Sequence, residues 1–168
     1  MHLSAPPSSG SQMLARVRRA LADDLFVLHF QPIVSLEDRR PARHEALLRL
    51  ADDPAGQLTA PALFLPAAER AGVIGQIDRW VLEKVASLLG GHGGGAFAGT
   101  GIAANVSALS ASDPSLLADI ARLLDRYEVD PELLVIEITE TAAIPDTRAC
   151  GKCSASACRM ALSARPTT

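Results

Sequence analysis

The spacing of apolar residues along the chain changes from segment to segment and predicts alternating helices and strands. Leu14, Val17 and Leu21 recur at helical spacing and predict a helix over residues 11–22, with Ser11 as its N-cap. The same kind of spacing, with turn residues at the ends, predicts three more helices over residues 59–72, 75–89 and 113–127. Thr59 is the expected N-cap of the helix over residues 59–72. In the helix over residues 75–89, Leu88 is expected on the buried stripe.

Four shorter segments have the composition and alternation typical of strands, at residues 26–30, 43–50, 101–107 and 133–139. Pro32 is expected to end the first strand, because proline cannot donate a hydrogen bond to a sheet ladder. In the second strand Glu45, Leu47 and Arg49 share one face, since successive side chains alternate. The resulting order is helix, strand, strand, helix, helix, strand, helix, strand. It predicts an α/β fold with a largely parallel sheet, open or closed.

The two ends of the chain lack these patterns. Residues 1–10 are rich in Ser and Pro and are expected to form a disordered leader. Residues 148–168 hold all three cysteines but no Val, Ile or aromatic residue, and they predict an unstructured tail. The abrupt change of composition favours a tail that is out of frame after a frameshift. The domain itself is therefore expected to span residues 11–147.

Composition narrows the class of protein. The 168 residues are 48% hydrophobic and 21% charged, which is typical of one globular domain with a real core. A formal net charge of −3 and the lack of an extended basic cluster argue against a nucleic-acid partner. No apolar run is long enough to span a membrane, and the first residues do not resemble a secretory signal. A cytoplasmic location without membrane contact is therefore expected.

Polar side chains gather near the ends of the later strands. Glu45 and Arg49 come from the second strand, Asn105 from the third and Glu137 from the fourth. Ligands of parallel α/β folds bind at the carboxyl ends of the strands, and two carboxylates with an amide oxygen suit Mg²⁺ or Mn²⁺. Arg49 offers a planar fork suited to phosphate. The alternative is structural: Glu45 pairs with Arg49, and Glu137 caps a helix.

Four short motifs occur in an order and at a spacing that resemble the first half of an EAL domain, over about residues 24–147. The motifs are Phe30-Gln31-Pro32-Ile33-Val34, Glu45-Ala46-Leu47-Leu48-Arg49, Asn105-Val106-Ser107 and Glu137-Ile138-Thr139-Glu140. The resemblance implies an incomplete TIM-type (β/α)8 barrel with roughly its first four strands. It also implies a bacterial signalling function, the metal-dependent hydrolysis of cyclic di-GMP to the linear dinucleotide by a phosphodiesterase that uses two Mg²⁺ or Mn²⁺ ions.

The resemblance also implies roles for individual residues. Glu45, Asn105 and Glu137 look like metal ligands. Arg49 resembles a phosphate-contacting arginine, and Gln31 matches a glutamine that contacts the substrate.

The second half of the family's motifs is not found in this chain. Glu140 resembles a glutamate that steadies a loop beyond the next strand, but the Asp-Asp pair and the later Lys, Glu and Gln of the family are missing. No acidic residue follows Asp146. The catalytic set is therefore incomplete, and the truncated chain is expected to be inactive, with weak or lost binding of cyclic di-GMP. The alternative is a degenerate, non-catalytic module that binds cyclic di-GMP or another protein. An uncovered barrel face also predicts self-association.

Overall fold

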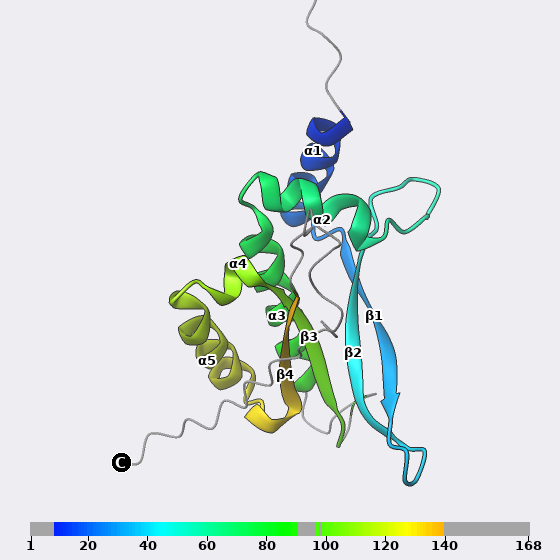
Figure 1. Ribbon diagram of the computed structural model, residues 1–168, viewed down its shortest axis with the longest axis vertical. Helices are drawn as coiled ribbons and strands as arrows, with labels where there is room; N and C mark the ends of the chain where they lie inside the picture. The colour runs from blue at the N-terminus through cyan, green and yellow to red at the C-terminus, as the bar shows by residue number, and fades with distance from the viewer. Residues whose placement is uncertain (1–8, 91–96, 98, 140–168) are drawn as a thin grey trace, which may run out of the picture.

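The computed structural model describes residues 9–90, 97 and 99–139, which form one sheet flanked by helices (Figure 1). The predicted order of helices and strands is confirmed, with one short helix, α4, and one 3-10 turn, η2, added. The elements are α1 Ser9–Ala22, β1 Phe26–Val34, β2 Pro41–Leu50, α2 Pro61–Arg70, α3 Ile74–Leu89, β3 Gly101–Ser107, α4 Ala108–Ala111, α5 Ser115–Tyr127, η2 Pro131–Leu133 and β4 Leu134–Thr139.

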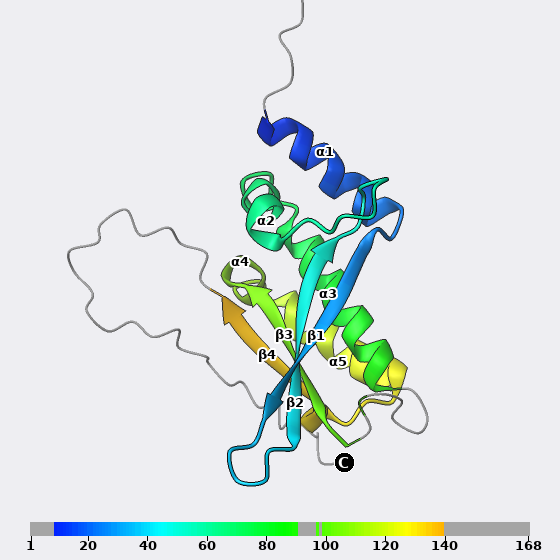
Figure 2. The same ribbon diagram turned by 90° about the vertical axis from the view of Figure 1, so that its right-hand side faces the viewer.

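The strands lie in the order β1-β2-β3-β4. β1 pairs with β2 in the antiparallel sense, whereas β2, β3 and β4 are mutually parallel. The largely parallel sheet expected from the sequence is thus confirmed. The parallel strands end on one side of the molecule, β3 and β4 near α4 and β2 near α2, and the turn between β1 and β2 projects from the opposite end (Figures 1 and 2).

Three local expectations about element ends are wrong. Ser11 does not cap α1 but lies inside it, because the helix begins at Ser9, within the segment expected as a leader. Pro32 does not end β1 but lies within it, opposite His44. The sheet tolerates this proline because β1 is an edge strand, on which a missing N–H need not cost a ladder hydrogen bond. Thr59 does not cap α2. It forms a β-bridge with Leu50 through two backbone hydrogen bonds of 2.8 and 3.1 Å, so that α2 begins two residues later with Ala60 at its N-cap.

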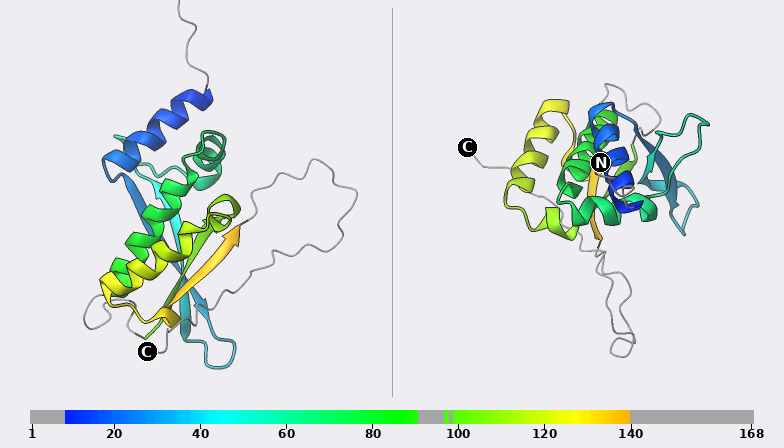
Figure 3. Two further views of the ribbon diagram at one scale, coloured as in Figure 1. Left: turned by 90° about the vertical axis from the view of Figure 1, so that its left-hand side faces the viewer. Right: turned by 90° about the horizontal axis from the view of Figure 1, so that it is seen from above.

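One face of the sheet forms the core with the helices. α3 and α5 lie on the same side of the sheet (Figures 2 and 3). The buried strand residues on this side include Ala46, Leu50, Ile102, Ala104, Val106 and Ile136. From α3 the predicted stripe of Ile77, Val81 and Val85 is buried, but Leu88 is 42% exposed and Leu89 is buried in its place. The buried face of α3 also includes Ile74, Asp78, Leu82 and Ala86. At about 100° of rotation per residue, the centre of this wider face lies nearer to Leu89 than to Leu88.

The opposite face carries every second residue of the same strands and is called the inner face below. On β2 it presents Glu45, Leu47 and Arg49, as the alternation predicted. These three side chains are half-buried. The core therefore fixes the sheet from one side and leaves the polar residues on the other. Among the described residues, no helix is long and apolar enough to cross a membrane.

Candidate functional site

Besides Arg49, the register of the sheet places four predicted site residues, one from each strand, on the inner face. Gln31 of β1 lies directly opposite Glu45 of β2, and Glu45 lies beside Ala103 of β3. Asn105, two residues further along β3, pairs with Glu137 of β4. Residues that are paired, or two apart on one strand, share a face. All four strands thus contribute polar side chains to one continuous patch.

A direct contact joins two of these strands. The Nδ2 amide of Asn105 donates a hydrogen bond of 3.0 Å to Oε1 of Glu45 across 60 residues of sequence. Glu137 is the residue of β4 that pairs with Asn105. Its carboxylate makes no hydrogen bond to any other residue in the described part of the chain. The structure therefore brings together Glu45, Asn105 and Glu137, the three residues that the sequence indicated as metal ligands.

The structural alternative for these residues does not hold in the described part of the chain. Arg49 donates from Nη1 to the carbonyl oxygen of Leu48 at 2.7 Å and forms no ion pair with Glu45. Glu137 lies inside β4, so it is not a helix cap. Gln31 is exposed on the edge strand. Glu140, the sixth predicted residue, lies outside the described residues.

The donor chemistry of the patch fits a hard divalent cation in part. The hydrogen bond from Asn105 occupies Oε1 of Glu45, which leaves Oε2 of Glu45, Oδ1 of Asn105 and the Glu137 carboxylate as donors. Mg²⁺ is commonly held by one or two carboxylates, with waters and phosphate oxygens completing its shell. The described residues include no group of three or more His, Cys, Asp or Glu that could hold a metal. The patch therefore fits one side of a metal site.

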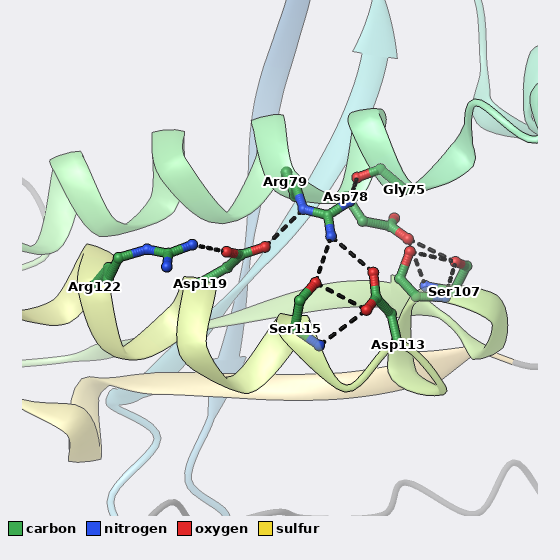
Figure 4. A network of polar contacts seen from close by, with 9 residues as sticks. Gly75, Asp78, Arg79, Ser107, Asp113, Ser115, Asp119 and Arg122 are labelled. Atoms are coloured by element: carbon green, nitrogen blue, oxygen red, sulfur yellow. Dashed lines mark hydrogen bonds and ion pairs between the residues drawn. The ribbon is translucent and has the colours of Figure 1, made fainter.

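A buried carboxylate that sequence reasoning missed anchors the carboxyl end of β3. Asp78 of α3 is 5% exposed and accepts two hydrogen bonds from Ser107 through Oδ2, from the backbone N–H at 3.1 Å and from Oγ at 2.6 Å (Figure 4). Ser107 follows Asn105 by two residues and caps α4 by accepting from the N–H of Ser110. The only sequence signal was an acidic residue on the apolar stripe of a helix.

Next to Asp78, Arg79 joins α3 to α5 (Figure 4). Its Nε donates to Asp119 at 2.7 Å, and its Nη2 donates to Asp113 at 2.8 Å. Hydrogen bonds from Ser115, and then from Arg79, lower the pKa of the Asp113 carboxyl. The network lies on the helical side of the sheet, so it fixes the scaffold and does not belong to the inner face.

A second ion pair ties α1 to the loop that follows Arg49. Arg16 donates to Asp52 from Nε at 2.7 Å and from Nη2 at 2.6 Å, and to Oγ1 of Thr59 at 2.9 Å. The Asp52 side chain is only 3% exposed. The hydrogen bonds from Arg16 lower the pKa of the Asp52 carboxyl. This structural role of Arg16 depends on a contact with a residue 36 positions later in the chain.

Comparison with known proteins identifies the architecture. The sequence model of the EAL domain matches residues 14–163, a wider span than the motifs alone indicated. The chain belongs to the EAL domain family. MucR of Pseudomonas aeruginosa, a bifunctional diguanylate cyclase and cyclic di-GMP phosphodiesterase, is 36% identical over 143 residues. YkoW of Bacillus subtilis, described as a signalling protein, is 34% identical over 128 residues. These matches cover 82% and 74% of this EAL chain, but only 20% and 15% of the relatives.

Solved structures agree on the fold. A MucR phosphodiesterase in complex with cyclic di-GMP has a TM-score of 0.70 at 36% identity, over 80% of this chain and 54% of that chain. The EAL domain of FimX from Pseudomonas aeruginosa, bound to cyclic di-GMP, has a TM-score of 0.67 at 36% identity, over 75% of this chain and 49% of that chain. The fold expected from the sequence, part of a TIM-type (β/α)8 barrel with four strands, is confirmed.

Proposed function

We propose that the inner face of this EAL domain binds one phosphodiester of cyclic di-GMP together with a divalent cation, Mg²⁺ or Mn²⁺. Glu45, Asn105 and Glu137 would hold the cation. The observation that carries the proposal is the 3.0 Å hydrogen bond between Asn105 and Glu45, with Glu137 in register beside Asn105. Three parallel strands thus each offer a hard oxygen donor on the face of the sheet opposite α3 and α5.

The neighbouring residues suit the anionic ligand. Arg49 lies on the same face as Glu45, four residues nearer the carboxyl end of β2, and only its Nη1 donates within the described residues. Its remaining N–H groups can bind phosphate oxygens in the planar geometry that guanidinium favours. Gln31, opposite Glu45, can donate and accept through its amide. When bound, a divalent cation in such a site neutralises phosphate charge and acidifies a water molecule.

The comparisons support cyclic di-GMP as the ligand. Relatives at 35–36% identity are named cyclic di-GMP phosphodiesterases, and two of the solved EAL structures are complexes with this nucleotide. We propose that a longer protein containing this segment, with the remaining strands of the barrel, hydrolyses cyclic di-GMP. For the 168-residue polypeptide by itself, we propose weak binding without hydrolysis, because it offers no carboxylate after Asp146 to build a second metal site.

Paramagnetic Mn²⁺ tests the site directly. In the isotope-labelled 168-residue chain, Mn²⁺ should broaden the amide signals of residues near Glu45, Asn105 and Glu137 before any others. Glu137→Gln should weaken Mn²⁺ binding about tenfold or more, because it removes one of two carboxylates. Glu132→Gln is the matched control, since Glu132 is exposed on η2 before the amino end of β4. Broadening that is unaffected by Glu137→Gln would contradict the proposal.

Incubation with cyclic di-GMP and Mg²⁺, followed by chromatography of the nucleotides, tests for hydrolysis. Linear dinucleotide formed by the 168-residue chain would refute the proposed lack of activity. Self-association through the inner face, and the frameshift expected for the tail, stay predictions. Light scattering of the purified chain and resequencing of the gene, respectively, are the measurements that check them.

A further inference from the structure

A histidine on the inner face is not used by the proposed metal site. His29 of β1 lies directly opposite Leu47 of β2. Ala46 pairs with Ala104, which places Leu47 beside Asn105, and Asn105 pairs with Glu137. His29 therefore belongs to the same row across the sheet as two of the three proposed metal ligands. Its partner Leu47 lies two residues nearer the carboxyl end of β2 than Glu45, the partner of Gln31.

The surroundings of His29 show that its imidazole lies on the inner face. The residues on either side of it in the chain belong to the other face, where Phe30 packs on Phe97 with ring centroids 4.6 Å apart. Leu28 also packs against the core. His29 itself is exposed, and its ring makes no hydrogen bond or ion pair within the described residues. Both ring nitrogens are thus free of partners in the part of the chain that the structure describes.

The position of His29 favours a nucleobase over a phosphate as its partner. Leu47 separates it from Asn105 and forms an apolar strip between the imidazole and the proposed cation. A flat base can lie over such a strip, whereas a phosphate would lose hydration there and has the cation and Arg49 nearby. Guanine presents two adjacent acceptors, N7 and O6, to a donor at its edge. A neutral imidazole carries one N–H donor.

We propose that His29 is a specificity-determining residue, which donates a hydrogen bond from its imidazole N–H to the N7 and O6 edge of a guanine that lies over Leu47. This inference rests on the proposed function, because it needs the phosphodiester to be held at Asn105 and Glu137. It adds the placement of a base on β1. It also predicts that this contact favours binding of guanine over adenine, because adenine carries an amino donor where guanine has the acceptor O6.

The test measures the affinity of the 168-residue chain for cyclic di-GMP and cyclic di-AMP in the presence of Mg²⁺. His29→Ala should weaken cyclic di-GMP binding about five- to tenfold, the equivalent of one hydrogen bond to the ligand. It should weaken cyclic di-AMP binding less and leave Mn²⁺ broadening at Asn105 unchanged. His29→Gln retains an N–H donor and should recover most of the loss. Ile33→Ala, on the same face of β1 but two layers further from Leu47, is the control and should change nothing.

The outcomes separate the two proposals. Unchanged cyclic di-GMP affinity in His29→Ala, with normal Mn²⁺ broadening at Asn105 and Glu137, would overturn the role of His29 alone. An equal loss for both dinucleotides would also overturn it, because an unspecific edge contact would then explain the effect. Absence of Mn²⁺ broadening at Asn105 in the unaltered chain would overturn the proposed function and this inference with it. Should His29→Ala fail to fold, NMR of the unaltered chain replaces it. The imidazole signals of His29 should shift on addition of cyclic di-GMP, whereas those of His44, on the opposite face, should not; unshifted His29 signals would overturn its role.

Discussion

Removing the charge of Arg16 should destabilise the chain, because it leaves a buried carboxylate without its partner. Arg16 holds both oxygens of Asp52, whose side chain is 3% exposed, while Arg16 itself is 37% exposed. Breaking a fully buried ion pair costs about 3–5 kcal/mol. Solvent around the partly exposed guanidinium reduces this figure, so we expect Arg16→Met to lower the free energy of unfolding by about 2 kcal/mol.

The effect of pH on this loss follows from the direction of the pKa shift. The hydrogen bonds from Arg16 lower the pKa of Asp52 in the folded chain below its value in the unfolded chain, which is about 3.9. The stabilisation is therefore fully present above the unfolded pKa and is lost as the pH falls through the folded pKa. The difference in stability between the unaltered chain and Arg16→Met should accordingly be largest near pH 7 and shrink below about pH 4.

Urea denaturation followed by circular dichroism measures this difference. At pH 7 the midpoint for Arg16→Met should lie about 1 M below that of the unaltered chain, for a typical dependence on urea of about 2 kcal/mol per M. Arg18→Met is the matched control, because Arg18 is exposed on the same helix and has no ion pair within the described residues. A loss in Arg16→Met that equals the loss in Arg18→Met, or that stays constant down to pH 3, would refute the reasoning.

Two further substitutions test the scaffold around the site. Asp78→Ala should lower the free energy of unfolding by about 2–3 kcal/mol in the same urea assay, because the N–H and Oγ of Ser107 lose their buried acceptor; a change below 0.5 kcal/mol would contradict this role. Gly90→Ala should cost at least about 2 kcal/mol, since a Cβ there would lie 1.9 Å from the carbonyl oxygen of Tyr127. Gly10→Ala, where no atom lies within 4 Å of the added Cβ, should be neutral or stabilising.

The face of each inner-face residue could be predicted because alternation along a strand is a local property. Glu45 and Arg49 needed only the two-residue period of β2 to be placed on one side of the sheet. That Glu45 and Asn105 lie close together also followed, once parallel strands were expected to end at one edge. The hydrogen bond between them was not predicted. Spacing alone also allowed Glu45 to pair with Arg49. The resemblance of the motifs to the EAL family indicated instead that Glu45, Asn105 and Glu137 act together.

The features that sequence reasoning missed depend on distant parts of the chain. Whether Pro32 ends a strand depends on whether that strand is central or at an edge, which pairing decides and local sequence does not. Thr59 has the chemistry of a helix cap, but its backbone is used by Leu50 in a β-bridge. The acceptor role of Asp78 requires Ser107, 29 residues later, to arrive at the same point. In each case a local rule was overridden by a tertiary contact.

The register of the strands explains why Glu45 and Asn105 are in contact although they are not a paired couple in the sheet. Glu45 is the direct neighbour of Ala103, whereas its hydrogen-bond partner Asn105 lies two residues further along β3. Strands of a barrel tilt against its axis, so residues at one height are staggered from strand to strand. An offset of two residues keeps both side chains on the inner face, while an offset of one would turn one of them into the core. The position of Asn105 is therefore set by barrel geometry: moving it by one residue would place an amide among the buried side chains beside Ala104 and Val106.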